Sequence, residues 1–332
     1  RIFVLPGDVY SEELLISSYR AIMGLGFFEA PLPTPQMEQL PSGDVDITFE
    51  VKEKQTGTFN FGTTIGGWGG LAGFIGFDHP NLFGQAKSGS LQWQFGTRYN
   101  SFSASYTDPA IRQSQVSGSA SVFSTSQSGS RGFQFSEGEY RRTGASARIG
   151  FALPWDRRFS RLFLGYQAAM TSYDNRNSDD TSVFGLPDGF LSTFNISLLR
   201  QTLDSPLFPT VGTRNEIRAE LSGGPLGGDG DFQKYTASGS WWVPVGQLGG
   251  GQVGVRPVRL ALGITAEGGA IFGDASRFPF EQFWMGGVQF GQPLRGYDET
   301  TITPLGYFPR NTGGLALSDR LGNAFVRLST EF

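Results

Sequence analysis

An alternation of apolar and polar residues repeats along most of this chain and limits what it can fold into. From Gly57 onward the period is two; for example, Leu91, Trp93 and Phe95 alternate with Gln92 and Gln94. Such a period places successive side chains on opposite faces of a β-strand. Many of the segments run ten or more residues, which exceeds the roughly five or six usual in soluble sheets and suffices to cross a bilayer at a tilt. About twelve strands are predicted, near 57–67, 70–78, 87–98, 100–107, 114–126, 138–152, 159–173, 189–202, 211–223, 232–245, 255–273 and 320–332.

The two faces of these strands differ in a way that favours a membrane barrel. A soluble sandwich, the alternative, would fill its inner face with Val, Ile and Leu. Here the second face is small and polar, as in a hydrated lumen. We therefore predict a mainly β fold, a transmembrane antiparallel β-barrel that closes because an open edge is untenable in hydrocarbon. The residues predicted to face lipid are Leu91, Trp93, Phe95, Leu162, Leu164, Phe194, Ile196 and Leu198, and those predicted to face the lumen are Gln92, Gln94, Ser103 and Ser105.

The first 55 residues have a different pattern. Ser11 followed by Glu12 and Glu13 is typical of a helix start, and apolar residues follow at helical spacing. Gly24 and Gly26 are candidates for a left-handed helix end. After a proline-rich connection, residues 44–54 alternate as a strand. We expect a small α+β module at 1–55 and the barrel at 56–332.

Composition excludes several classes of function. The chain has no Cys, so it cannot be a thiol enzyme, a zinc ribbon or a disulfide scaffold. Its net charge of −4 argues against a nucleic-acid partner. No phosphate loop, carboxylate pair or metal-ligand spacing stands out, so we expect no catalytic residue, no metal and no cofactor. His79, the single histidine, lies in a turn sequence; a serine-hydrolase triad around it is the alternative.

One long segment, 274–319, interrupts the alternation. It holds eight aromatic residues, which argues against disorder. Loops longer than about 15 residues in compact domains are usually functional or disordered. We therefore predict that this loop is packed and folds back into the lumen of the barrel.

Several short motifs, in order along the chain, resemble those of the outer-membrane barrel-assembly family, the group of BamA, TamA and the two-partner secretion pores. Three lie in the first module and resemble the last periplasmic POTRA domain. The others resemble a turn between the first barrel strands, a D-x-P…P-T-x-G strand connection, the F-x-x-G-G…V-R-G-F/Y signature of the sixth extracellular loop, and the G-G-N-A that opens the next strand. The motifs are Gly7-Asp8-Val9-Tyr10, Leu25-Gly26-Phe27-Phe28, Val45–Val51, Phe74–Gly84, Asp204-Ser205-Pro206 with Pro209-Thr210-Val211-Gly212, Phe283–Gly287 with Leu294-Arg295-Gly296-Tyr297, and Leu321–Ala324.

The resemblance implies a sixteen-stranded barrel preceded by POTRA domains. Two departures stand out: Leu294 replaces the more usual Val, and the family continues for four strands after the last motif. The chain is thus expected to be a fragment, from within the last POTRA domain to about the twelfth barrel strand. A complete twelve-stranded barrel is the competing interpretation. Under truncation, the strands near 57–67 and 321–332 should not pair with each other.

The resemblance also implies a function and a set of structural residues. The protein would fold and insert client β-barrels into the outer membrane, by lateral opening of its seam and local membrane perturbation, with its POTRA part in the periplasm. Implied partners are unfolded barrel clients, periplasmic chaperones, accessory assembly lipoproteins, the lipid bilayer and lipopolysaccharide. Alternatives are a two-partner secretion or TamA-like polypeptide pore, a passive porin or a barrel enzyme. Inside the barrel we expect Phe283, Gly286, Gly287, Leu294, Arg295, Gly296 and Tyr297, with Arg295 bonded to the wall, and in a structural turn Asp204, Pro206, Pro209 and Gly212.

Overall fold

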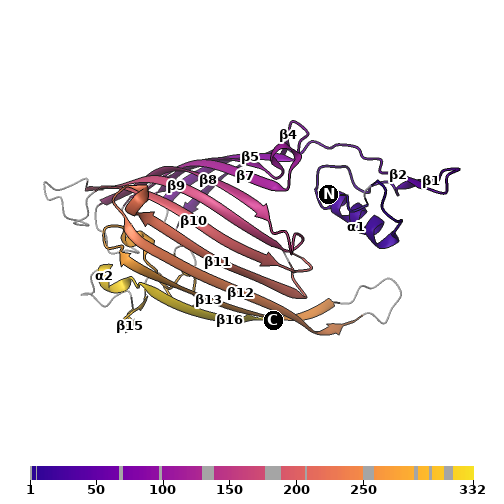
Figure 1. The fold of residues 1–332 in the computed structure, drawn as a ribbon. Coiled ribbons are helices and arrows are strands. Elements are labelled where there is room, and N and C mark those ends of the chain that lie inside the picture. The colour runs from indigo at the N-terminus through magenta and orange to yellow at the C-terminus, as the bar shows by residue number, and fades with distance from the viewer. Residues whose placement is uncertain are drawn as a thin grey trace.

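The structure is a computed structural model and describes most of the chain. The described residues are 2–4, 6–66, 70–96, 99–128, 138–175, 188–205, 208–249, 258–287, 291–298, 301–309 and 317–332. One wide, curved sheet forms the body of the molecule, and the first module lies beyond one of its ends (Figure 1). None of the helices in the described part of the chain is long and apolar enough to span a membrane.

The N-terminal module holds helix α1 (Glu12–Met23) and the strand pair β1 (Gln36–Gln39) and β2 (Val45–Thr48). The Ser11 side chain accepts from the Leu14 N–H, as the sequence predicts for a helix cap. Gly24 is right-handed with φ −66°, so the left-handed residue after the helix is Gly26, with φ +70°. The strand predicted over 44–54 is shorter than expected because its second half leaves β1 and bonds residues 27–29 instead.

The body is a twelve-stranded antiparallel sheet in which strands adjacent in the chain are also neighbours in space. This confirms the predicted fold class and all twelve predicted strands. The strands are β3 (Thr58–Gly66), β4 (Gly70–Leu82), β5 (Lys87–Gly96), β6 (Tyr99–Asp108), β7 (Val116–Ser128), β8 (Gly138–Ala152), β9 (Ser160–Asn175), β10 (Gly189–Gln201), β11 (Gly212–Gly223), β12 (Asp231–Leu248), β13 (Val258–Asp274) and β16 (Ala324–Glu331).

The two edges of the sheet are β3 and β16, and in the described residues they do not pair with each other. The expectation that these strands are not neighbours is therefore confirmed. The sheet curls into a barrel-like wall, but it is not closed between β3 and β16 (Figure 1).

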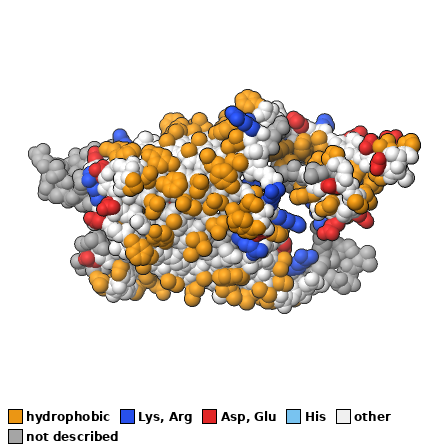
Figure 2. Space-filling view, viewed as in Figure 1, with side chains coloured by type: hydrophobic (Ala, Val, Ile, Leu, Met, Phe, Trp, Pro, Cys, Tyr) orange, Lys and Arg blue, Asp and Glu red, His pale blue; other side chains and the backbone are white. Residues whose placement is uncertain are grey.

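The strand registers confirm the predicted division into two faces. Gln92 is opposite Ser103, while Leu91 is opposite Ala104, so polar and apolar residues separate onto the inner and outer faces. Hydroxyl groups pair across the inner face, as in Ser121 with Ser146 at 2.8 Å. On the outer face, apolar side chains form a broad band, and charged side chains gather toward its ends (Figure 2).

Short elements connect the strands. They are η1 (Ile111–Gln113), η2 (Gly224–Leu226), η3 (Pro279–Glu281), β14 (Ile302–Thr303), β15 (Gly306–Tyr307) and α2 (Leu317–Arg320). The last four belong to the segment between β13 and β16, at the end of the barrel opposite α1 (Figure 1).

Candidate functional site: a loop held in the barrel lumen

The segment after β13 turns inward and buries aromatic side chains against the inner wall. Phe278 and Phe283 are 3% and 5% exposed, and they join a core cluster with Leu191, Phe232 and Ile271. Burial of this apolar surface favours docking at about 25 cal/mol per Å². The beginning of the loop is therefore part of the packed interior of the barrel.

The wall makes room for this packing at a glycine. Gly269 of β13 faces inward, and a Cβ atom placed there would lie 2.6 Å from the ring of Phe283. That ring also packs against Phe325 of β16, with ring centroids 4.7 Å apart. Phe283 thus fits between two neighbouring strands because one of them lacks a side chain at the point of contact.

A charged cluster ties the same part of the loop to two strands of the wall. The Glu281 carboxylate lies 2.7 Å from Arg142 of β8 and 3.8 Å from the Lys234 ammonium of β12. Lys234 also donates a hydrogen bond of 2.8 Å to the Glu281 carbonyl. These three side chains are only 17–23% exposed, so water screens their attraction less than at an open surface.

Aromatic contacts surround this ionic cluster. The Phe280 ring lies 4.5 Å from Tyr140 of β8, 6.2 Å from Tyr173 of β9 and 5.7 Å from Trp284, measured between centroids. Offset and edge-on pairs at such separations are favourable beyond their buried area. Glu281 and its neighbours therefore form a single anchor on the wall, which we call the Glu281 anchor: Phe280, Glu281, Arg142, Lys234 and Tyr140.

Two further arginines hold the loop before and after this anchor. Arg277 pairs with Asp229 at 3.1 Å and donates to the Asp188 carbonyl. The Arg327 guanidinium of β16 donates through Nη1 to the Pro293 carbonyl at 2.6 Å. Its Nη2 pairs with the Glu267 carboxylate of β13. The loop is thus attached to the wall at several separate points.

The two halves of the predicted signature pair with each other. Gly287 donates to the Tyr297 carbonyl at 2.7 Å and accepts from the Leu294 N–H at 2.9 Å. Gly286, Gly287 and Gly296 have φ of +118°, +65° and +86°, which favours glycine at all three positions. These glycines shape the compact backbone of the signature.

Arg295, the residue expected to bond the wall, is exposed in the structure. Within the described ranges its guanidinium makes no hydrogen bond or ion pair. Tyr297 is also exposed and packs edge-on against Tyr307 at 5.6 Å. Leu294 is half-buried, and Phe283 is the signature side chain that reaches the core. The bond between Arg295 and the wall stays a prediction.

The D-x-P…P-T-x-G connection lies between β10 and β11, at the end of the barrel nearest α1. The Asp204 carboxylate accepts from the backbone N–H groups of Ser205, Thr210 and Val211, and from the Thr210 hydroxyl at 2.6 Å. Loss of some hydration alone would raise the pKa of the exposed Asp204, but these hydrogen bonds outweigh it and lower the pKa to about 2.

The other residues of this turn are partly described. Gly212 has φ +115°, and a Cβ there would lie 2.5 Å from the Thr202 carbonyl oxygen, so glycine is required. Pro209 is half-buried, and Pro206 lies outside the described residues.

The sequence did not reveal the Glu281 anchor. Arg142 and Lys234 are charged residues on the inner face of their strands, which is otherwise mostly small and polar. This contrast could have marked them in the sequence. It indicates that these side chains need a partner, but it does not identify Glu281, which is 139 and 47 positions away along the chain. Across the described residues, no group of His, Asp and Glu could hold a metal ion.

This geometry defines a class: β-barrel proteins of outer-membrane type whose lumen holds one of their own loops. A family model described as the Omp85 superfamily domain matches residues 81–332, and the chain belongs to this superfamily. BamA-like members of the superfamily are among its relatives, as the recognised motifs predicted.

The chain is 28% identical over 311 residues to the outer membrane protein assembly factor BamA of Nitratidesulfovibrio vulgaris, covering 91% of this chain and 36% of that protein. It is 26% identical to the sorting and assembly machinery component 50 homolog A of Xenopus laevis, covering 87% of this chain and 66% of the relative. The chain therefore spans about a third of that BamA and about two thirds of the Xenopus protein.

Solved structures show the same fold. BamA from Haemophilus ducreyi lacking POTRA domains 1–3 aligns with a TM-score of 0.65 at 19% identity, over 99% of this chain and 62% of the other. CdiB from Acinetobacter baumannii aligns with a TM-score of 0.53 at 13% identity, over 90% and 53%. The Nitratidesulfovibrio relative is described as an assembly factor and the Xenopus relative as a component of a sorting and assembly machinery.

Proposed function

We propose that this chain is the barrel part of an outer-membrane assembly factor, which folds and inserts client β-barrel proteins into the outer membrane. Membership of the Omp85 superfamily and the similarity to BamA and to the sorting and assembly machinery component 50 homolog A support this proposal. The observation that carries it is the loop held in the lumen by the Glu281 anchor. A passive porin would not need this signature loop, whose Phe278, Phe280 and Phe283 pack against the inner wall.

The proposed mechanism uses the edge of β3 that has no neighbouring strand among the described residues. A strand edge with free N–H and C=O groups is a template for pairing with another strand, which is how a client hairpin would be received. The outer-facing Phe59 and Phe61 on this edge are strongly exposed. The wall opens at this seam while the anchored loop keeps the remaining strands in register.

The domain assignment is part of the same proposal. Residues 1–55 form the C-terminal part of the last POTRA domain, in the periplasm, and 56–332 form the barrel. The outer face of the sheet contacts lipid. Unfolded clients, periplasmic chaperones and accessory lipoproteins are the proposed partners, together with the bilayer and lipopolysaccharide.

The test is complementation in cells depleted of the native protein. The full-length protein carrying Glu281→Ala should assemble client barrels several-fold more slowly in a pulse-chase assay. Asp298→Ala is the matched control, because this exposed carboxylate lies in the same loop and, among the described residues, Asp298 is bonded only through its backbone carbonyl, which accepts from Thr301. Secretion of one dedicated polypeptide with normal assembly of client barrels would favour the two-partner secretion pore and contradict the proposal.

A further inference from the structure

The connection between β11 and β12 folds back over the outside of the barrel. It runs from Gly223 to Gly230, and we call it the glycine turn. Four of its glycines, at 223, 224, 227 and 228, have positive φ. A Cβ on Gly228 would lie 2.8 Å from the Phe190 carbonyl oxygen, so the close approach to β10 requires glycine.

Specific hydrogen bonds hold the glycine turn against the outer face of β10. The Asp229 N–H donates to the Phe190 carbonyl, and the Phe190 N–H donates to the Asp229 carboxylate, both at 2.7 Å. The fully buried Ser192 hydroxyl donates to the Leu226 carbonyl at 3.2 Å and lies 2.8 Å from the Tyr166 hydroxyl. These hydrogen bonds hold the glycine turn in place, so that it forms a wall on the membrane-facing side of the sheet.

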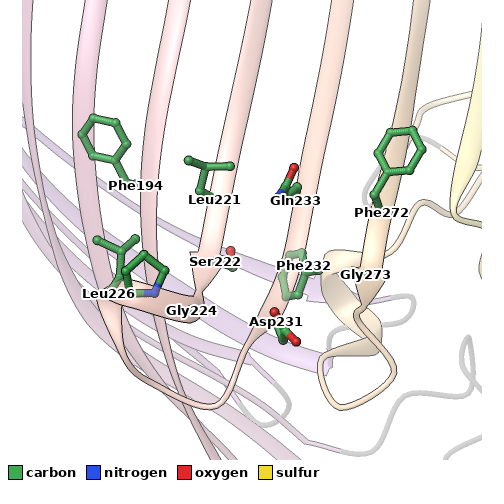
Figure 3. A pocket seen from close by; sticks show the side chains of 12 residues that line it. Phe194, Leu221, Ser222, Gly224, Leu226, Asp231, Phe232, Gln233, Phe272 and Gly273 are labelled. Carbon is green, nitrogen blue, oxygen red and sulfur yellow. The ribbon is translucent and has the colours of Figure 1, made fainter.

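Between this wall and the strands lies an apolar groove of about 490 Å³. Phe194, Leu221 and Phe272 line it from three strands, and Leu226 lines it from the glycine turn (Figure 3). Its volume is within the roughly 300–1,000 Å³ typical of small-molecule sites. Further along β10 and β11, Ile196 and Ile217 are exposed on the same face as the groove.

The charge at the groove points to one kind of head group. Among the described residues that line it, Asp231 is the one charged side chain, and none is basic. Asp231 is opposite Asp274 of β13 in the strand register, so a second carboxylate lies beside it. This acidic rim repels a phosphate and attracts an ammonium group.

We propose that this groove binds a zwitterionic phospholipid, with one acyl chain between the strands and the glycine turn and the head-group ammonium at Asp231. The inference goes beyond the proposed function, because it concerns a lipid site on the outer face and not client assembly. It rests only on this face lying in a bilayer.

Native mass spectrometry of the full-length protein in detergent tests this site. The delipidated protein is titrated with phosphatidylethanolamine or with phosphatidylglycerol of the same acyl chains. We expect one phosphatidylethanolamine to bind first, at least five-fold more tightly than phosphatidylglycerol. Asp231→Asn should keep the binding but abolish the five-fold preference.

Two tryptophan variants on β11 distinguish lipid binding in the groove from nonspecific lipid contact with the outer face. Leu221→Trp fills the groove and should weaken the first binding event at least five-fold. Ile217→Trp, on the same face of the same strand and outside the groove, should leave it unchanged. Leu226→Ser, in the turn outside the sheet, should weaken binding even if Leu221→Trp folds poorly. Equal binding of the two lipids by the wild type, or equal effects of Leu221→Trp and Ile217→Trp, would overturn the proposal.

Discussion

At the scale of single residues, Glu281 is the carboxylate on which the attachment of the loop depends. Without it, Arg142 and Lys234 would be left as partly buried cations with no carboxylate between them. We expect Glu281→Ala to weaken docking of the loop by about 2–3 kcal/mol, the size of a charge-assisted contact. Hydrogen exchange of residues 278–285 should rise by more than ten-fold while the strands stay protected. Unchanged exchange in this variant would show that the aromatic contacts alone hold the loop.

Asp204 predicts a pH dependence of the turn near α1. Its pKa is lowered to about 2 in the folded protein, so its stabilising effect is complete above the ordinary carboxyl pKa near 4. The effect is lost as the pH falls from about 4 toward 2. Because Asp204 is exposed, we expect Asp204→Ala to cost only about 1 kcal/mol at pH 7.

The measurement for Asp204 is denaturant unfolding at several pH values. The difference between the wild type and Asp204→Ala should be constant from pH 7 to 5 and should shrink toward zero near pH 2. A difference that does not change with pH would mean that the Asp204 charge contributes nothing to this turn.

At the scale of one element, β5 offers a test of the two faces. Leu91 and Gln92 are adjacent in the middle of the strand, at the same depth, and point to opposite sides. Leu91→Arg should cost about 2–4 kcal/mol, because a charge would face the bilayer midplane. Gln92→Arg should cost far less, since it faces the lumen. Folding yields and unfolding midpoints in lipid vesicles compare the two, and equal costs would argue against a lipid-facing outer surface.

The alternation was enough to predict all twelve strands, because one face meets apolar surroundings and the other a polar interior. Their ends were harder to place. β4 continues to Leu82, beyond the predicted 78, through an irregularity between His79 and Leu82. The following turn places Phe83 and Ala86 at positive φ, which the residue types do not suggest.

The loop shows where sequence reasoning stopped. Its aromatic content predicted packing, and the motif singled out Arg295. The structure instead has Glu281 paired with Arg142 and Lys234, from strands far away in the chain. Such pairing depends on strand register and on how deeply the loop enters the lumen, and neither is encoded in local spacing.

For the whole molecule, the central claim is that the loop is seated against the inner wall of β8. These 332 residues hold no cysteine, so no other thiol within them competes with an introduced pair. The Tyr140 and Phe280 ring centroids are 4.5 Å apart, whereas the side chain of the adjacent Arg141 is on the opposite face of the strand.

Cysteine cross-linking in intact membranes tests this placement most directly. The pair Tyr140→Cys with Phe280→Cys should be joined rapidly by a short thiol cross-linker, and the pair Arg141→Cys with Phe280→Cys should not. Adding Glu281→Ala should slow the first reaction. Equal cross-linking of the two pairs, or none with Tyr140→Cys, would contradict a loop held in the lumen.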